Sequence, residues 1–282
     1  MRRRLGPDDL VLTNCSSGCA PLPEMIDLAA ANGFAGLSLW PTVLTEAVDA
    51  GHDPAGLKRR LDDAGLVCND VDAAIVWVGR DELPATVPGG GGQPVDLLFE
   101  VAATLDADLC NVAIVGDGGY SEAAAVDAFG RIAERIVAAG LVPHLEFLPI
   151  SPVADVGTAL RIVEASGVES AGVMIDAWHV QRGPTTLDDL AAVDAERVLG
   201  IQLCDAPASP AADLRHETLH ERLLPGEGDG DVVGLLRTLD GLGHRAPITI
   251  EVYSDALNEL GPTEATRRAG QTLRAVLGAA RS

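Results

Sequence analysis

The sequence predicts an α/β fold, a single (β/α)8 TIM barrel that spans residues 1–282. Short apolar runs alternate with helical patterns from one end of the chain to the other, and no stretch holds only helices or only strands. The alternation gives about eight β-then-α units, which is the number that closes a parallel sheet into a barrel. Barrels of roughly 250 residues are commonly one domain, so the length agrees with this fold class.

Each expected strand is a short run rich in Val, Leu, Ile or Ala. The runs are Leu10–Asn14, Ala35–Trp40, Val67–Asp72, Leu109–Val115, Val142–Leu148, Ala171–Asp176, Val198–Cys204 and Pro247–Val252. The helices expected between the strands show apolar residues at helical spacing. The clearest are Pro23–Asn32, Val95–Leu105, Ser121–Ala139, Val156–Ser166 and Thr263–Ala279.

An open, doubly wound parallel sheet is the alternative architecture, and the glycine motifs do not favour it. Its usual sign is a G-x-G-x-x-G motif that opens the first helix, and this sequence has none there. The glycine run at 88–92 ends in Gln93-Pro94 and predicts a flexible loop. The glycines at 116–119 follow an expected strand but lack the lysine of a P-loop, so they predict a loop at the active-site face of the barrel.

The net charge of −22 limits the partners of the protein. A surface this acidic repels phosphate backbones and anionic lipids, so we expect neither nucleic acid nor a membrane as a partner. The five cysteines form no C-x-x-C pair, and the basic start Arg2-Arg3-Arg4 precedes no long apolar run. These features predict reduced thiols and a cytoplasmic location. A homodimer is a candidate assembly.

Side chains alternate along a strand, so in a barrel every second residue points inward. When the apolar residues of the last four expected strands face the helices, a polar residue points inward near the C-terminal end of each strand. These residues are Glu146, Asp176, Gln202 and Glu251. Because the C-terminal strand ends carry the chemistry of such barrels, we expect the four side chains to meet there.

Three converging carboxylates need a counter-charge. At about 4 Å each pair costs roughly 4 kcal/mol at an effective dielectric near 20, and a divalent cation removes this repulsion. With the amide oxygen of Gln202 the ligand set is all oxygen, which suits Mg²⁺ or Mn²⁺ better than Zn²⁺. Alternatively, each acid caps the next helix or pairs with an arginine. Four inward polar ends on consecutive strands favour the metal site.

Further candidate residues lie close to the strand ends. His179, just after the sixth strand, is expected to contact substrate, with metal binding or simple packing as alternatives. Trp40, Trp77 and Trp178 are all the tryptophans of the chain, and they are expected to wall the pocket or to pack at its rim. Arg80, just past the third strand, is a candidate for binding an anionic group of the substrate.

Several short motifs together resemble the xylose isomerase-like TIM barrels, the group that contains sugar phosphate isomerases and epimerases. The resemblance runs from about Leu22 to the end of the chain. The motifs are Gly36-Leu37-Ser38-Leu39-Trp40, Leu145-Glu146-Phe147, Asp176-Ala177-Trp178-His179, Gln202-Leu203-Cys204-Asp205, Arg222 with Pro225-Gly226-Glu227-Gly228-Asp229, and Ile250-Glu251-Val252.

The resemblance implies a role for each polar residue of these motifs. It implies that Glu146, Asp176, Gln202 and Glu251 bind one divalent metal ion, and that His179 and Arg222 contact substrate oxygens. Many family members have histidine at the position of Gln202. Glutamine there, followed by Asp205-Ala206-Pro207, is similar to bacterial 3-dehydroshikimate dehydratases.

The step shared by this family is removal of a proton next to a carbonyl, with the metal stabilising the enediolate. We therefore expect a metal-dependent isomerase or epimerase of a ketose or cyclic polyhydroxy ketone, with Glu146 and Glu251 as a two-base pair. The close alternative is a dehydratase of the 3-dehydroshikimate or keto-inositol type, with His179 as the base. Arg222 would hold a hydroxyl, phosphate or carboxylate group of the substrate. The third hypothesis is a non-catalytic sugar-binding barrel or a subunit of a larger complex.

Overall fold

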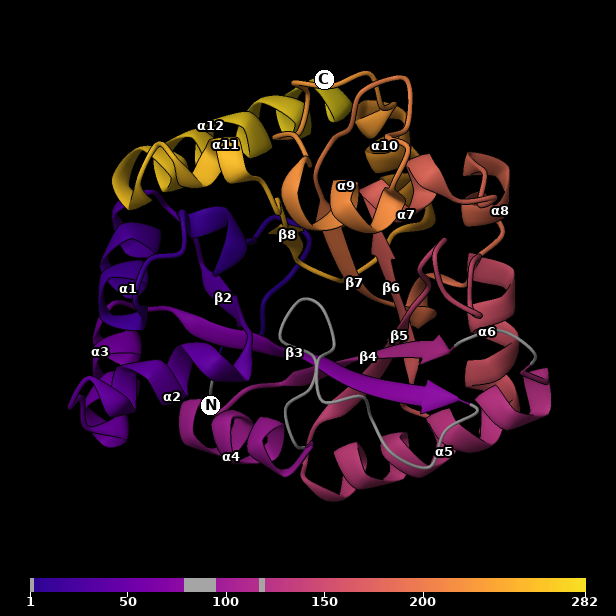
Figure 1. The fold of residues 1–282 in the computed structure, drawn as a ribbon, viewed down its shortest axis with the longest axis horizontal. Coiled ribbons are helices and arrows are strands. Elements are labelled where there is room, and N and C mark those ends of the chain that lie inside the picture. Colours follow the sequence, from indigo (N-terminus) through magenta and orange to yellow (C-terminus); the bar gives the residue numbers. More distant parts are fainter. Residues whose placement is uncertain (1–2, 79–94, 117–119) are drawn as a thin grey trace.

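The computed structural model describes residues 3–78, 95–116 and 120–282, which form a closed barrel of eight strands in sequence order (Figure 1). Neighbouring strands are parallel throughout, including β1 and β8, which close the barrel. The predicted TIM barrel is therefore confirmed. Arg80 and the glycine run at 88–92 lie outside the described residues, and of the run at 116–119 only Gly116 is described.

The strands match the predicted runs closely, with one exception. They are β1 (Leu10–Thr13), β2 (Gly36–Leu39), β3 (Val67–Val78), β4 (Leu109–Gly116), β5 (Val142–Glu146), β6 (Gly172–Asp176), β7 (Val198–Leu203) and β8 (Ile248–Ile250). The exception is β3, which was expected to end at Asp72 and continues to Val78. It continues because the apolar run after Asp72 pairs with β4 as far as Gly116, beyond a register shift between Val71 and Ala74.

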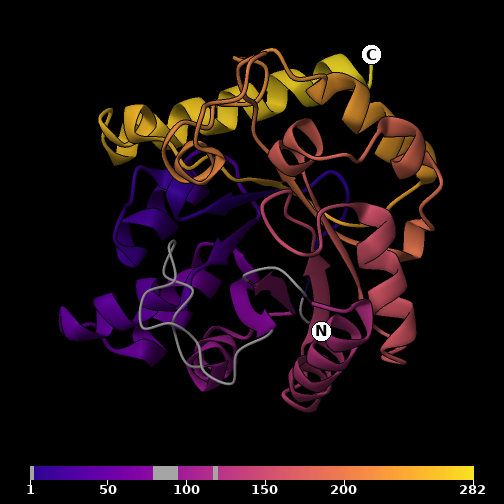
Figure 2. The same cartoon turned by 45° about the vertical axis from the view of Figure 1, so that its right-hand side comes forward.

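The helices lie around the outside of the barrel, and the five that were predicted begin and end within one residue of the expected bounds. The helices are α1 (Leu22–Ala31), α2 (Pro41–Asp49), α3 (Pro54–Asp63), α4 (Val95–Leu105), α5 (Glu122–Ala138), α6 (Val156–Ala165), α7 (Ala177–Arg182), α8 (Leu187–Ala191), α9 (Leu214–His220), α10 (Val232–Leu242), α11 (Asp255–Asn258) and α12 (Pro262–Ala280). Figure 2 shows α12 running along the outside of the barrel, where it contacts α1 and α10.

Several helices begin at a polar side chain that accepts a backbone N–H of the first turn, which satisfies a donor that the helix itself leaves free. Asp53, Ser121 and Asp155 do so for α3, α5 and α6. Among the helices of the described residues, none has both the length and the apolar character needed to cross a membrane.

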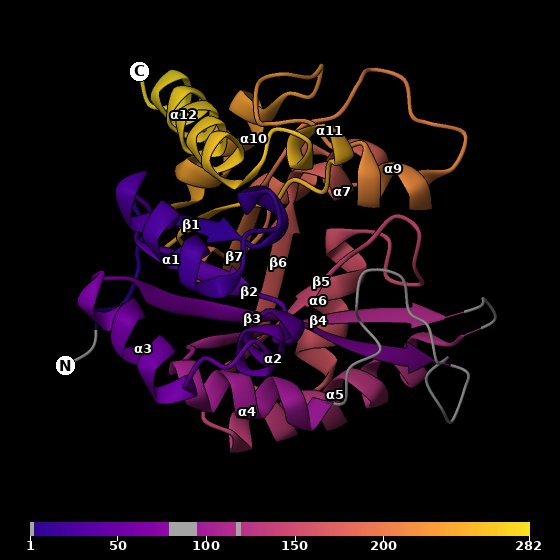
Figure 3. The ribbon, with the colours of Figure 1, turned by 60° about the vertical axis from the view of Figure 1, so that its left-hand side comes forward.

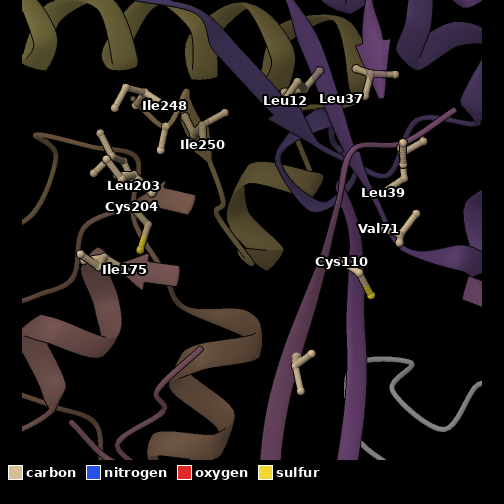
Figure 4. Packing of buried hydrophobic residues seen from close by; sticks show 14 of the residues in the cluster. Leu12, Leu37, Leu39, Val71, Cys110, Ile175, Leu203, Cys204, Ile248 and Ile250 are labelled. Atoms are coloured by element: carbon tan, nitrogen blue, oxygen red, sulfur yellow. The ribbon is translucent and has the colours of Figure 1, made fainter. Parts of the chain in front are cut away.

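The core lies between the barrel and the helices, where the outward residues of the strands are buried. Figure 4 shows Leu12, Leu203, Ile248 and Ile250 in this layer, and all four have no exposed surface. The residues that point into the barrel are less uniformly apolar and include Met174, His144 and Gly200. A methyl group added at Gly200 would lie 2.5 Å from Cε of Met174 and 3.2 Å from Cε1 of His144, so these side chains fill the barrel interior.

The C-terminal ends of the strands carry the longest connections. Figure 3 shows β3 and β4 projecting past the other strands on the side where α7, α9 and α11 lie. The packed barrel interior and this ring of connections together place the candidate site at the C-terminal mouth.

Candidate active site

A cavity of about 190 Å³ opens at the C-terminal mouth of the barrel. One wall is apolar and comes from the projecting parts of β3 and β4 and from the segment after β5, with Ile75, Trp77, Val115, Leu148 and Ile150. The polar lining comes from the other strand ends and from α9, with Asp72, Glu146, His179, Arg215, Thr218, Arg222 and Glu251. An apolar wall facing a few convergent polar groups is typical of a small-molecule site.

The structure brings the four predicted metal ligands into one buried network. Glu146, Asp176 and Gln202 lie on β5, β6 and β7, Glu251 directly follows β8, and none of the four is more than 7% exposed. Gln202 Nε2 donates to Glu251 Oε1 at 2.9 Å. Asp176 and Glu251 both accept from Nη1 of Arg222, at 2.8 and 3.3 Å.

His179 belongs to the same cluster. Its backbone N–H donates to Asp176 Oδ1 at 3.0 Å, and its ring Nε2 lies 2.9 Å from Glu146 Oε1. Among the His, Cys, Asp and Glu residues of the described chain, Glu146, Asp176 and His179 form the group whose candidate ligand atoms all lie within 4.8 Å of one another. The structure therefore places His179 close enough to join a metal site, whereas the sequence favoured a substrate contact.

Two polar residues of the cluster were missed by the sequence analysis. Asp72 on β3 lines the cavity and is 5% exposed, and Asn111 on β4 is fully buried. Asn111 Nδ2 donates to Asp72 Oδ1 at 2.8 Å and to Glu146 Oε2 at 2.7 Å. A polar residue inside an otherwise apolar strand was the available signal, and β3 shows it with Asn69, Asp70 and Asp72.

The electrostatics of the cluster fit a bound cation. Burial, with the nearby charge of Glu146, raises the pKa of Asp72 to about 8, and burial with the charge of Asp72 raises the pKa of Glu251 well above its usual value. Burial also acts to raise the pKa of Asp176, but Arg222 and His179 outweigh it and the pKa lies below the usual value. The floor of the cavity, where Asp72, Glu146, Asp176 and Glu251 lie, thus holds more acidic groups than the single guanidinium of Arg222 can balance.

The donor atoms support the same conclusion. Within the described chain, the buried amide oxygen of Gln202 has no hydrogen-bond partner, although its nitrogen is fully used. An orphaned buried acceptor beside uncompensated carboxylates fits a ligand that supplies positive charge. The residues present therefore fit a divalent cation.

Arg222 is held rigidly at the bottom of the cavity. Its Nε donates to the carbonyl of Thr218 at 2.9 Å and its Nη2 to the hydroxyl of the same residue at 2.8 Å. The guanidinium carbon lies over the ring of Trp178 and over that of Tyr253, 5.4 Å from each centroid. The predicted substrate-binding arginine therefore lines the cavity while its charge is shared with the floor carboxylates.

The tryptophans take different positions. Trp40 and Trp77 line the cavity, and Trp40 Nε1 donates to the hydroxyl of Tyr253 at 2.5 Å. Trp178 has no exposed surface, donates to Glu217 Oε1 at 2.9 Å and does not line the cavity. It packs behind Arg222, because α7 turns its side chain toward α9 rather than toward the barrel mouth.

Asp205, a residue of the Gln202-Leu203-Cys204-Asp205 motif, makes a set of backbone hydrogen bonds that the sequence analysis did not predict. Its fully buried carboxylate accepts backbone N–H groups from Ala206, Gly226, Gly228 and Gly230 at 2.8–3.1 Å. Its backbone also exchanges two hydrogen bonds with Leu223, the neighbour of Arg222. A side chain at position 228 would meet Asp205 Oδ1 at 2.5 Å, which explains the glycine there. We call this arrangement the Asp205 clamp.

The fold and the site define a (β/α)8 barrel with a carboxylate-rich candidate cation site at its C-terminal mouth. Residues 26–276 match the family model described as xylose isomerase-like TIM barrel. The chain belongs to this family, which confirms the resemblance seen in the sequence.

The curated relatives are enzymes. The chain is 26% identical over 249 residues to the 3-dehydroshikimate dehydratase of Pseudomonas aeruginosa, covering 86% of this chain and 38% of the relative. It is 27% identical over 135 residues to the inosose isomerase of Halalkalibacterium halodurans, covering 47% of each. The chain thus spans less than half the length of these relatives. Their names confirm, at the level of the family, the prediction of an isomerase/epimerase-like or dehydratase enzyme.

Solved structures share the fold. The IOLI protein, whose structure holds a zinc atom, superposes with a TM-score of 0.82 at 18% identity, covering 95% of this chain and 97% of that one. The probable 3-dehydroshikimate dehydratase AsbF of Bacillus anthracis gives a TM-score of 0.71 at 12% identity, covering 94% and 98%. The zinc atom is a property of that neighbour; in this chain, the buried group of Glu146, Asp176 and His179 is a possible site for a divalent metal.

Proposed function

We propose that this chain is a divalent-metal-dependent lyase that removes water from a cyclic polyhydroxy ketone of the 3-dehydroshikimate type. The observation that carries the proposal is the engagement of every carboxylate oxygen of Glu146 and Glu251. Glu146 contacts Asn111 and His179, and Glu251 contacts Gln202 and Arg222.

This engagement disfavours a two-base epimerase. Such an enzyme needs two free carboxylates, one on each face of the substrate, that take a proton and return one. Partners on both oxygens occupy the lone pairs with which a carboxylate would take a proton from the substrate. His179 lines the cavity, and its ring Nδ1 has no hydrogen-bond partner among the described residues, so it is the remaining candidate base.

The division of roles follows from these contacts. A divalent ion would supply Lewis-acid polarisation of the ketone, and it would be held by Glu146, Asp176, Gln202 and Glu251. We favour Mn²⁺ or Mg²⁺ because the four donor atoms are oxygens. His179 takes the proton from the carbon next to the ketone. The freed electron pair forms a carbon–carbon double bond as the bond to the hydroxyl on the next carbon breaks. This hydroxyl takes the proton that His179 now carries and departs as water, which leaves His179 neutral again.

The rest of the cavity supports this step. The apolar wall formed by Ile75, Trp77 and Val115 can cover one face of a six-membered ring and exclude water from it. Relatives support the same substrate type, because the two 3-dehydroshikimate dehydratases match 86% and 91% of this chain.

Isomerisation or epimerisation of a ring ketone is the second candidate, because three inosose isomerases match 42–54% of the chain. Both reactions begin with the same proton removal. A non-catalytic barrel is disfavoured, because Glu146, His179 and Glu251 are all present and meet in one site.

The test is incubation of the protein, stripped with a chelator and reloaded with Mn²⁺, with 3-dehydroshikimate. We expect an ultraviolet absorbance rise from an aromatic product, and we expect His179→Gln to abolish it. His216→Gln, an exposed histidine on α9 with a side chain 54% exposed, serves as the matched control. No absorbance change, together with deuterium uptake next to the ketone of inosose in D₂O, would instead support the isomerase.

A further inference from the structure

A second arginine, Arg215, lies at the rim of the cavity. It is exposed and sits on α9, three and four residues before Thr218 and Leu219. Residues at this spacing share one face of a helix, and all three line the cavity. Figure 3 shows α9 on the side of the barrel where the strands end. The guanidinium therefore stands where a ligand in the cavity meets solvent.

Two arginines, Arg215 and Arg222, line the cavity, and they differ in whether their guanidinium groups already have hydrogen-bond or ion-pair partners. The Arg222 guanidinium is bonded to Asp176, Glu251 and Thr218. The side chain of Arg215 has no ion pair or hydrogen bond within the part of the chain that the structure describes, and its backbone N–H donates to Asp213 Oδ1 at 2.9 Å. Exposed arginines elsewhere are commonly paired, such as Arg131 with Asp127. Arg215 thus has a permanent charge available to a ligand.

The charges of the site favour an anion at the rim and disfavour one at the floor. Glu146, Asp176 and Glu251 would repel a carboxylate placed beside them, while hydroxyl and ketone oxygens can face a cation there. A guanidinium binds a carboxylate through two parallel hydrogen bonds, and it gains much less from a neutral hydroxyl. A ring with its oxygens at the floor and a carboxylate at the opposite end would match both parts of the cavity.

We propose that Arg215 is a specificity-determining residue that selects ring substrates carrying a carboxylate over neutral ring polyols, by binding that carboxylate at the rim. This inference rests on the proposed function for the identity of the ring ketone. Arg215 takes no part in proton transfer, so its effect belongs to substrate binding.

The test measures binding without turnover. Dissociation constants of 3,4-dihydroxybenzoate and of catechol, which lacks only the carboxylate, are measured on the Mn²⁺-loaded protein by calorimetry. We expect the carboxylate to tighten binding by about ten- to a hundredfold, the range of a charged hydrogen bond. Arg215→Gln should abolish this preference without changing the affinity for catechol or for Mn²⁺, and Arg215→Lys should restore part of it. Arg59→Gln, an arginine 69% exposed on α3, is the matched control and should change nothing.

The outcomes separate this inference from the proposed function. A carboxylate preference that disappears in Arg215→Gln supports the role of Arg215 even when 3-dehydroshikimate is not dehydrated. A preference that persists in Arg215→Gln, or no binding of 3,4-dihydroxybenzoate by the wild type, overturns it even when dehydration is observed. For an active enzyme, the variant should raise KM and leave kcat within about twofold, since the contact is the same in ground and transition states.

Discussion

Replacing Asp205 with alanine tests whether the Asp205 clamp holds the segment that carries Arg222. The carboxylate accepts four backbone N–H groups at 2.8–3.1 Å, and a hydrogen bond to a charged group contributes about 1.5–3 kcal/mol. Three of the four bonds are only partly buried, so water replaces part of what is lost. We therefore expect the free energy of unfolding to fall by about 3 kcal/mol, which corresponds to a drop in Tm of about 5 °C for a protein of this size.

The assay compares Tm and turnover in Asp205→Ala and in Asp231→Ala. Asp231 caps α10 by accepting from the backbone N–H of Gly234 at 2.8 Å, and loss of such a cap costs about 1 kcal/mol. Asp205→Ala should also reduce kcat/KM at temperatures where it remains folded, because Arg222 loses its fixed position beside Asp176. A Tm equal to that of Asp231→Ala, or unchanged kcat/KM, would refute the reasoning.

Three further predictions concern the metal site. In metal-free protein the free energy of unfolding should fall by roughly 2 kcal/mol per pH unit between pH 6.5 and 8, since each extra proton held by the folded state contributes about 1.4 kcal/mol per pH unit. Burial raises the pKa of Asp72 to about 8 and that of Glu251 well above normal, so both keep protons that the unfolded chain has released. The pH window starts at 6.5 because burial lowers the pKa of His144 to about 3, so below pH 6.5 the neutral folded histidine makes stability rise with pH. Urea midpoints that rise with pH between 6.5 and 8 would contradict this prediction. Mn²⁺ should make the stability depend less on pH. Glu251→Gln should weaken Mn²⁺ binding by about a hundredfold in calorimetry, whereas the exposed Glu264→Gln should not. Gln202→His should shift the preference from Mn²⁺ toward Zn²⁺, since an imidazole nitrogen suits zinc better, and an unchanged ratio of the two affinities would argue that Gln202 is not a ligand.

The sequence was sufficient for the fold and for the general position of the site. Strand boundaries followed from apolar runs, and inward direction followed from alternation, so Glu146, Asp176, Gln202 and Glu251 could be grouped from their places at consecutive strand ends. This reasoning works because both faces of a barrel strand are constrained, one by the helices and one by the interior.

The same reasoning could not find Asp72 and Asn111 or assign partners. The register shift in β3 breaks the simple alternation near Asp72, and Asn111 lies within a strand rather than at its end. Arg222 lies 46 residues from Asp176 in the sequence, and no local pattern shows that these two pair. Trp178 directly follows the Asp176-Ala177 pair at a strand end, yet the direction of its side chain depends on how α7 packs against α9.

The cavity is lined by two different kinds of structure, the projecting strands β3 and β4 and the short helix α9. Backbone hydrogen bonds run along the pair as far as Val78 and Gly116, so the wall with Ile75 and Val115 is a continuous piece of sheet. Another part of the lining comes from the short helix α9, which is held by side chains such as Glu217, and Glu217 bonds Trp178 and Arg182. Because α9 is short and held mainly by side-chain contacts, whereas β3 and β4 are joined by backbone hydrogen bonds, amide hydrogen exchange should be faster in residues 214–220 than in residues 74–78.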